Sequence, residues 1–312
     1  MTQSMKKISI KPGLGCSQLI LGSMMLHEEK MEFSAGLMDA YVTAGGNSID
    51  TAHVYGASSS RAVGIWMQER KNRADMVIIG KGAHHDDKGP RVTLEGMEQD
   101  LAETFERMQT DYVDIFMLHR DDPNQSVGYI MESMNKQLEA GRCHALGVSN
   151  WTIARIQEAN EYAAAHQLEG LLCNSPNLSL AKPNEPRWAG CISVYADDAA
   201  WHERTQLPLL SWSSQAGGFF TGRYTPDNGD AELIRVYYSE DNWERYRRAE
   251  ALAKQKGVST NDIALAFVLN QTFPTCALIG PNSVAELQSS ANALALSLTQ
   301  EENRWLDLRK ES

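Results

Sequence analysis

The chain has 312 residues, of which 42% are hydrophobic and 22% are charged, a composition typical of a globular protein with a sizeable core. Its formal net charge of -11 argues against nucleic acid or an anionic membrane as the main partner, because both are bound through basic patches. No apolar run approaches the roughly 18 residues of a membrane span, and residues 1–11 lack the apolar core of a signal peptide, so we expect a cytoplasmic protein.

Short β-branched runs alternate with longer amphipathic segments along most of the chain. The predicted strands are residues 19–21, 48–50, 76–80, 113–119, 145–149, 170–174, 209–212 and 276–279. The predicted helices are residues 33–44, 60–72, 93–108, 129–140, 153–166, 196–204, 243–256, 261–270 and 284–293. This alternation predicts a parallel sheet with helices outside it, and eight such units favour a closed (β/α)8 TIM barrel over an open sheet.

Both ends of the chain are predicted to add elements to the barrel. Residues 8–10 and 17–21, around Pro12 and Gly13, predict a short N-terminal β-hairpin. Residues 299–309 predict an extra C-terminal helix, in which Thr299 and Glu302 have the spacing of a capping box. No linker or internal repeat divides the chain, so the prediction is one domain over residues 1–312.

Ionisable side chains stand at the carboxyl ends of three successive predicted strands. Asp50 ends the second predicted strand, and Tyr55 follows it by five residues. Lys81 comes directly after residues 76–80, and His119 ends residues 113–119. Because a parallel barrel assembles its active site at these strand ends, we expect the four groups to lie together at the mouth of the fold.

Two long segments interrupt the alternation, residues 181–194 and residues 217–241. Both follow predicted strands on the side where a barrel carries its substrate loops. The aromatic residues of the second segment predict that it is ordered and covers the site; they are Phe219, Phe220, Tyr224, Tyr237 and Tyr238.

Two common kinds of site are not supported. Gly13 and Gly15 precede the first barrel strand and lack a third glycine, so the chain has no Rossmann dinucleotide fingerprint. The five cysteines form no Cys-x-x-Cys pair, and we expect buried free thiols instead of disulfides or zinc ligands.

Seven stretches match the motifs of one known family, in that family's order and over nearly the whole chain. They are DTAHVYG at residues 50–56, IGK at 79–81, LHRDDP at 118–123, GVSN at 147–150, WS at 212–213, AGGFFTGRY at 216–224 and LIG at 278–280. In these stretches the chain resembles the aldo-keto reductase superfamily. The resemblance implies an NAD(P)(H)-dependent carbonyl reductase on a (β/α)8 barrel, with the cofactor across the carboxyl face.

The four strand-end groups suit carbonyl reduction, which needs a hydride on carbon and a proton on the developing alkoxide. Tyr55 can supply the proton, because a Lys81 ammonium beside it stabilises the phenolate and lowers the pKa of the phenol from its usual value near 10. Asp50 can hold Lys81 charged and oriented, and His119 can hydrogen-bond the substrate oxygen. The resemblance implies that these four residues are the catalytic tetrad.

For bound NAD(P)(H), the resemblance implies contacts from several parts of the chain. The residues expected near the nicotinamide and its ribose are Gly22, Ser23, Asp50, Ser149, Asn150 and Trp212, whose indole would stack under the ring. The family's glutamine on the sixth strand is replaced here, and Ser175, or less favourably Asn174, takes its place. The residues expected along the pyrophosphate are Ser213, Gln215, Gly217 and Arg223, whose guanidinium could pair with phosphate oxygens.

The adenosine end departs from the family pattern. Gly280 and Asn282 follow the eighth strand, where NADPH-preferring members usually place a Lys or Arg. Glu286 stands where such members have an Arg, and Ser289 and Ser290 stand where an acid and an asparagine usually bind adenine. A carboxylate repels a 2'-phosphate but accepts hydrogen bonds from a ribose diol. We therefore expect NADH to be used at least as well as NADPH.

The expected substrate is a small polar carbonyl compound, of the size of a sugar. The residues expected to face it are His53, His84, Arg120 and Trp188. No pattern in the chain fixes an oligomeric state.

Two other functions stay open at this point. A cofactor-binding regulatory protein, like the potassium-channel β subunits, would keep the fold and the tetrad but turn over poorly. A metal-dependent hydrolase or isomerase could use the HHDD run at residues 84–87 with His53 and His119. Adjacent residues often diverge from a single metal ion, so we expect a solvated loop at this run and no bound metal.

Overall fold

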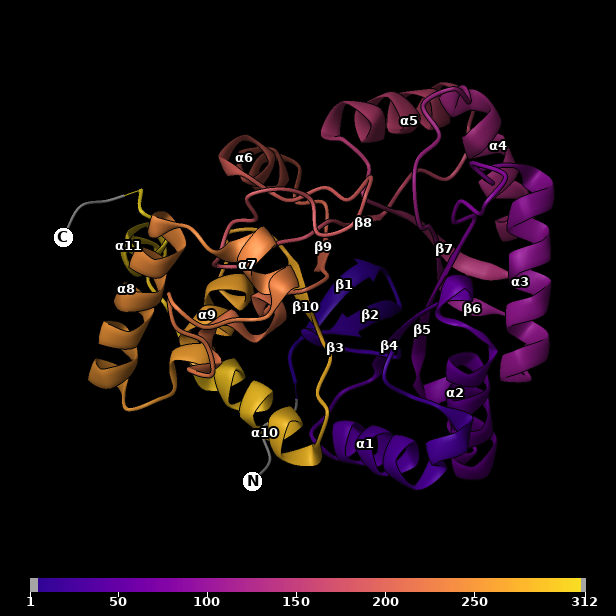
Figure 1. Ribbon diagram of the computed structural model, residues 1–312. Coiled ribbons are helices and arrows are strands. Elements are labelled where there is room, and N and C mark those ends of the chain that lie inside the picture. The colour runs from indigo at the N-terminus through magenta and orange to yellow at the C-terminus, as the bar shows by residue number, and fades with distance from the viewer. Residues whose placement is uncertain (1–4, 310–312) are drawn as a thin grey trace. The chain divides into compact units, whose positions relative to one another are not determined.

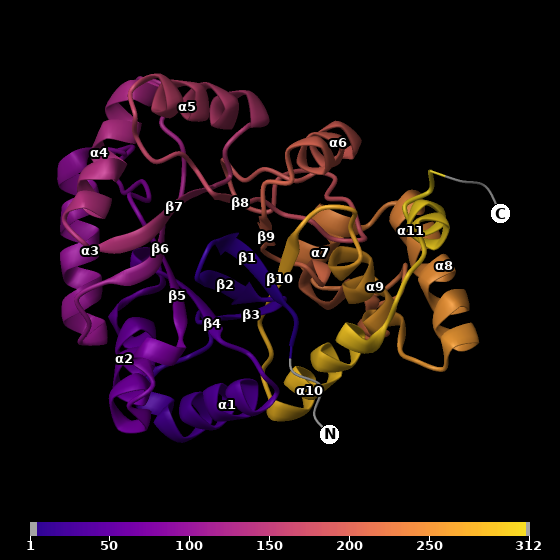
Figure 2. The same cartoon turned by 180° about the vertical axis from the view of Figure 1, so that it is seen from behind.

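A computed structural model describes residues 5–309, and Figures 1 and 2 show it from two opposite sides. Strands β1 (Lys7–Lys11) and β2 (Leu14–Ser17) form an antiparallel hairpin, with Gly13 at φ 83° in its turn. The predicted hairpin is therefore confirmed, but the placement of its second strand at residues 17–21 is wrong. Lys11 pairs directly with Leu14, because the turn consists of Pro12 and Gly13 alone, and Leu19 begins the barrel instead.

Eight parallel strands form a closed barrel in the order β10–β3–β4–β5–β6–β7–β8–β9. Their bounds are β3 Leu19–Gly22, β4 Ser48–Ala52, β5 Val77–Gly82, β6 Val113–Leu118, β7 Cys143–Ser149, β8 Cys173–Ser175, β9 Leu209–Ser211 and β10 Thr275–Ile279. Strands β4, β5 and β6 are buried at every residue, as parallel strands covered on both faces are. The predicted (β/α)8 barrel is confirmed.

The chain divides into two compact units, residues 1–175 and residues 176–312, and the prediction of a single domain stays a prediction. The helices of the first unit are α1 Met31–Thr43, α2 Ala57–Arg70, α3 Leu94–Met108, α4 Val127–Glu139 and α5 Ile153–Ala165. Figure 1 shows them outside strands β4 to β7. Helices α3, α4 and α5 begin where the hydroxyls of Thr93, Ser126 and Thr152 accept backbone N–H groups.

The second unit holds six helices among its described residues. They are α6 Ala196–Thr205, α7 Ala231–Tyr237, α8 Glu240–Lys256, α9 Thr260–Leu269, α10 Val284–Asn292 and α11 Gln300–Leu306. The predicted C-terminal helix is α11, and both halves of its capping box between Thr299 and Glu302 are present. Helix α8 packs against α9 and α11, as Figure 2 shows.

The segment after β9 is ordered around a cluster of aromatic rings. Phe219, in the 3-10 turn η4 (Ala216–Thr221), has its ring centroid 4.7 Å from that of Trp243, and Phe220 stacks on Tyr246 at 5.9 Å. Tyr238 adds an edge contact to Trp243. The predicted order of this segment is confirmed, although the sequence did not predict helix α7 within it.

None of the helices between residues 5 and 309 combines the length and the apolar character needed to cross a lipid bilayer.

Candidate active site

The register of the strands places Asp50, Lys81 and His119 on one face of the sheet. Asp50 pairs with Ile79, two residues before Lys81, and Lys81 pairs with Met117, two residues before His119. Residues two apart on a strand point to the same face. The sequence therefore delivers these three side chains to the same side of neighbouring strands, near their carboxyl ends.

Asp50 and Lys81 form a buried ion pair. The Lys81 Nζ donates a hydrogen bond to Asp50 Oδ1, and almost nothing of either side chain is exposed. Burial lowers the pKa of Lys81, because it penalises the ammonium, while the Asp50 carboxylate opposes that shift. Burial likewise raises the pKa of Asp50, and the Lys81 charge opposes this. Each group is thus the main compensation for the charge of the other.

Tyr55 reaches the same place from the turn after β4. It ends the 3-10 turn η2 (His53–Tyr55), and Gly56 at φ 93° then turns the chain into α2. The Lys81 Nζ lies 5.3 Å from the centroid of the Tyr55 ring, and the His119 ring meets the Tyr55 ring edge-on at 5.8 Å. The structure therefore gathers all four residues of the predicted tetrad.

His119 is held as a neutral imidazole. Burial lowers its pKa well below the usual value, and the positive charges of Lys81 and Arg120 lower it further. Its Nδ1 is buried and has no hydrogen-bond partner among the described residues. The His84 ring lies 4.9 Å from the His119 ring, so the structure places this predicted substrate residue beside the tetrad. A neutral ring carries one N–H, which can be donated to a carbonyl oxygen.

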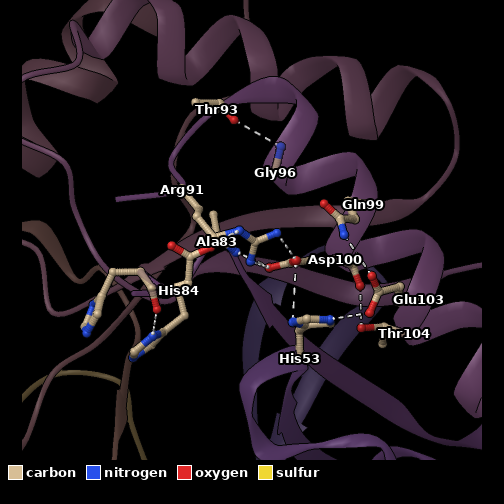
Figure 3. Close-up of polar contacts among 12 residues, drawn as sticks. His53, Ala83, His84, Arg91, Thr93, Gly96, Gln99, Asp100, Glu103 and Thr104 are labelled. Carbon is tan, nitrogen blue, oxygen red and sulfur yellow. Dashed lines mark hydrogen bonds and ion pairs between the residues drawn. The ribbon is translucent and has the colours of Figure 1, made fainter. Parts of the chain in front are cut away.

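His53 is engaged by two carboxylates of helix α3 (Figure 3). Its Nε2 lies 2.8 Å from Glu103 Oε2, and its Nδ1 lies 3.5 Å from Asp100 Oδ1. Gln99 also donates to Glu103. His53 was predicted to contact substrate, and that role stays a prediction. The contacts in the structure tie the turn that carries Tyr55 to α3.

Asp100 is a residue of this region that the sequence did not reveal. It is buried, its Oδ2 accepts the backbone N–H of Ala83 at 2.8 Å, and its Oδ1 accepts from Arg91 Nη2 at 2.6 Å. Ala83 lies two residues after Lys81 and has a positive φ of 57°. One carboxylate thus contacts the turn beyond Lys81 and, through His53, the turn before Tyr55.

A weak signal for Asp100 was present in the sequence. It lies on the apolar face of α3, three residues after Met97 and four before Thr104, which are both buried. An acid on the buried face of an amphipathic helix needs a partner inside the fold, and here Arg91 and Ala83 provide it.

The nicotinamide contacts predicted in the first unit lie on the tetrad's face. Ser149 pairs in register with Ser175, and its hydroxyl donates to the Ser175 carbonyl at 2.8 Å. Asn150, at φ 60°, donates from Nδ2 to the Ser149 hydroxyl. Asn174 points to the opposite face, because it lies one residue before Ser175. The alternation therefore favours Ser175 over Asn174 as the residue on this face.

Gly22 and Ser23 follow the same register at the end of β3. Gly22 pairs with Asp50, and the Ser23 backbone N–H donates to the Asp50 carbonyl at 2.9 Å. The Ser23 hydroxyl is in turn bonded to that of Ser59 at 3.1 Å. Both residues thus lie beside Asp50.

In the second unit, Trp212 lies against Trp188. Their ring centroids are 5.6 Å apart, and Trp188 is 43% exposed. Arg187 stacks over Trp188 at 4.7 Å and donates from Nη1 to the Ser213 hydroxyl at 3.0 Å. It also pairs with Glu232 at 2.6 Å. Arg187 was not predicted from the sequence, because it lies in an irregular proline-containing segment without periodicity.

The residues predicted for the pyrophosphate and adenosine form a second cluster of this unit. Arg223 Nη2 lies 3.1 Å from Glu286 Oε1, and the backbone N–H of Asn282 donates to Glu286 Oε2 at 2.8 Å. The Gln215 amide donates to the Ser290 hydroxyl at 3.4 Å. The remaining predicted positions are Gly217, at φ 63° in η4, Gly280, directly after β10, and Ser289, within α10.

The Glu286 carboxylate is ionised at neutral pH. The Asn282 backbone N–H and the Arg223 guanidinium both hold its pKa below the usual range. Arg223 is itself 64% exposed at its side chain. Arg223, which was predicted to contact the pyrophosphate, is thus paired with Glu286, which was predicted to contact the adenosine ribose.

The described residues form neither a metal-binding cluster nor a disulfide. Over residues 5–309, no three His, Cys, Asp or Glu side chains are grouped in a way that could hold a metal ion. All five cysteines are free and buried, as predicted, and burial raises the pKa of both Cys16 and Cys143 to about 12. These thiols are protonated at neutral pH and are poor nucleophiles.

Comparison with known proteins agrees with this geometry. A family model described as "Aldo/keto reductase family" matches residues 18–308. Norsolorinic acid reductase B of Aspergillus parasiticus is 27% identical over 315 residues, which cover 95% of this chain and 81% of that protein. The oxidoreductase YrpG of Bacillus subtilis is 24% identical, with 95% and 93% covered. Aldo-keto reductase ausK of Aspergillus calidoustus is 26% identical, with 96% and 80% covered.

Proposed function

Because the chain belongs to the aldo/keto reductase family, and is therefore an oxidoreductase, we propose that it reduces a small aldehyde or ketone to an alcohol with NADH or NADPH. The observation that carries this proposal is the buried Asp50–Lys81 pair beside the rings of Tyr55 and His119. An ion pair or a histidine with a purely structural role would not require Asp50, Tyr55, Lys81 and His119 to lie together.

The cofactor fits the residues that face this site. The buried His119 Nδ1 has no partner in the described part of the chain, and Ser149 and Ser175 lie on the same face. Ser149, Asn150 and Ser175 would hold the nicotinamide carboxamide through their polar side chains. When bound, the reduced cofactor supplies the hydride that goes to the carbonyl carbon.

The side chains then supply the proton and the electrostatics. The Tyr55 hydroxyl gives its proton to the alkoxide oxygen as the new C–H bond forms. The Lys81 ammonium stabilises the resulting phenolate, and Asp50 keeps Lys81 charged and in place. The neutral His119 donates its N–H to the carbonyl oxygen and holds it near Tyr55. A proton from solvent restores Tyr55.

We also propose that NADH is used at least as well as NADPH. The ionised Glu286 carboxylate supports this, because it would repel a 2'-phosphate and accept a hydrogen bond from a ribose hydroxyl. Arg223 opposes the effect in part, since it neutralises some of that charge. Steady-state kinetics with each cofactor test the proposal, and a strong preference for NADPH would overturn it.

The proposed substrate is a small polar carbonyl compound such as a sugar or a sugar-derived aldehyde. His84 and Arg120 beside the tetrad support a polar substrate. We propose a cytoplasmic location, because five free cysteines without a disulfide among the described residues suit a reducing compartment.

Oxidation of NADH and NADPH against a panel of sugars, short aldehydes and methylglyoxal tests the function. We expect turnover with at least one carbonyl and its loss in Tyr55→Phe, which keeps the ring and removes the proton. Tyr55→Phe with full activity would refute the assignment of Tyr55. Cofactor binding without turnover on any carbonyl would favour a regulatory protein.

A further inference from the structure

We propose that Arg120 binds an anionic group of the substrate, a carboxylate carried near the reducible carbonyl. The proposal rests on the proposed carbonyl reduction and narrows its substrate to a class, the carboxylated aldehydes and ketones. It concerns a single side chain, which stands next to His119 in the sequence and beside the tetrad in the fold.

Arg120 is a buried guanidinium that forms no ion pair with any carboxylate between residues 5 and 309. Only 9% of the residue is exposed, and its Nε is buried without a hydrogen-bond partner in the part of the chain that the structure describes. Its hydrogen bond from Nη1 goes to the backbone carbonyl of His119, at 2.8 Å. Charges so deeply buried are normally paired, so this arginine has the properties of a group that meets its anion in a ligand.

The nearest acids along the chain are engaged by other groups. Asp121 Oδ2 lies 3.2 Å from Arg155 Nε. Asp122 Oδ1 accepts the backbone and side-chain N–H groups of Asn124, at 3.0 and 3.2 Å. The LHRDDP motif therefore brings two carboxylates close to Arg120 in sequence, and neither of them neutralises it.

The charge of Arg120 acts directly on the catalytic groups. It is one of the causes that lower the pKa of Lys81, of His84 and of His119. Because Arg120 follows His119 in the chain and its Nη1 donates to the His119 carbonyl, the guanidinium lies close to the place where the substrate carbonyl must sit. A planar guanidinium matches the two oxygens of a carboxylate and is the preferred partner for one in a buried site.

A carboxylate bound at Arg120 would balance the positive charge of the site and orient the substrate. Four positive or potentially positive groups lower the pKa of His119, namely Lys81, Arg120, His84 and His85, and among the described residues Asp50 compensates Lys81. A bound carboxylate would supply the missing negative charge. It would also fix the orientation of the substrate, because the carbonyl would be held between Tyr55 and His119 at one end and the carboxylate by Arg120 at the other.

A matched pair of substrates tests this. We would measure kcat/KM for 4-carboxybenzaldehyde and for benzaldehyde in the wild type, Arg120→Met and Arg120→Lys. We expect the wild type to prefer the carboxylated aldehyde and Arg120→Met to lose at least about 30-fold on it, with little change on benzaldehyde. Arg120→Lys keeps the charge and should retain part of the preference. Arg61→Met removes an exposed guanidinium and should change neither substrate.

Equal losses on both aldehydes in Arg120→Met would mean that Arg120 only supports the backbone at His119, and a wild type without preference would also overturn the proposal. Calorimetric binding of benzoate and of benzamide to the enzyme loaded with NAD+ or NADP+ separates this proposal from the proposed function. If no aldehyde is reduced but benzoate binds and Arg120→Met loses that binding, the proposed function fails and the anion site stands. If benzoate binds the wild type and Arg120→Met alike, or does not bind, the anion site fails.

Discussion

The Lys81 ammonium donates a hydrogen bond to the Asp50 carboxylate across neighbouring strands, and only 3% and 4% of the two side chains are exposed. If either charge is removed, the other is left buried without bulk water to solvate it. Stability and catalysis therefore depend on the same pair, and they can be separated by removing one charge or both.

We predict that Lys81→Met lowers the free energy of unfolding by about 3–5 kcal/mol, because it leaves a buried carboxylate unpaired. Asp50→Asn with Lys81→Met should recover most of that loss, since no net charge then stays buried. Urea unfolding measures the stabilities, and oxidation of NADH or NADPH measures activity. The double variant should be folded and inactive. An active double variant would show that Lys81 does not assist Tyr55.

Asp100 is predicted to position both catalytic turns. In Asp100→Asn, the new amide N–H group would face the N–H donors of Ala83 or Arg91, and one of these hydrogen bonds would be lost. We therefore expect kcat to fall by about tenfold or more, with little change in KM. Unfolding should become easier by about 1–3 kcal/mol. Glu103→Gln is the control, because it keeps an oxygen acceptor for His53 at a half-exposed position. If KM rises and kcat does not change, Asp100 acts on substrate binding instead.

Gly147 is predicted to exclude any side chain. An added Cβ would come within 2.8 Å of Cys173 Sγ and 2.9 Å of Met117 Cε, so Gly147→Ala should cost about 1–3 kcal/mol in stability. Cys173→Ala removes the sulfur and should restore part of that loss in the double variant. Gly36→Ala is the control, since an added Cβ meets nothing within 4 Å there and Ala is the better helix former. Equal thermal midpoints for both alanine variants would contradict the prediction.

Acid is predicted to destabilise the fold through its buried histidines. His202 is fully buried, its Nδ1 bonds the Leu207 carbonyl, and burial lowers its pKa. Above its ordinary pKa of about 6.5, both states are neutral and His202 makes no pH-dependent contribution. Below that pH the unfolded chain takes up a proton that the folded chain refuses, so the free energy of unfolding falls.

His202→Phe removes the titrating group, so the stability difference between wild type and variant should shrink as the pH falls from about 7.5 to 5.5. Urea unfolding at several pH values measures it. A difference that does not change with pH would show that His202 stays unprotonated in both states or titrates equally in both. His84 and His119 shift in the same direction and add to the acid sensitivity of the wild type.

Cofactor choice is predicted to respond to Glu286. Glu286→Gln keeps an acceptor for the Asn282 backbone N–H but frees Arg223 from its carboxylate. We expect KM for NADPH to fall by about tenfold, the scale of about 1.4 kcal/mol, with KM for NADH changing less. Arg235→Gln, which removes another exposed guanidinium paired with a glutamate, is the control. An unchanged ratio of the two KM values would show that Glu286 does not influence binding of the 2'-phosphate of NADPH.

The alternation of strands and helices was readable from the sequence because parallel strands carry runs dominated by apolar residues, such as Val113–Leu118, in which only Asp114 is charged. The catalytic groups were readable for a related reason, since Asp50, Lys81 and His119 stand at the ends of such runs and Tyr55 follows Asp50 by five residues. Helix α7 was not, because seven residues with a cap at Asp230 leave too short a pattern. The second hairpin strand was misplaced because Ser17 and Leu19 belong to two different strands.

The supporting residues could not be read in the same way. Asp100 and Arg187 come from α3 and from an irregular segment, and their roles arise from contacts with Ala83 and Ser213 that lie far away in sequence. Helix and strand periodicities describe which face a residue occupies, not which distant atom it meets. That information appears only once the chain is folded.

The strict alternation along β5, β6 and β7 divides these strands into two sets for protein engineering. Ile79 and Met117 stand on the face of Lys81, so libraries at these two positions remodel the surroundings of the catalytic lysine, while Gly147 on the same face must stay glycine. Ile78, Phe116 and Leu146 stand on the other face, so changes there tune the packing of the outer helices. Selection for new substrates and selection for thermal tolerance can therefore proceed at separate residue positions of the same three strands.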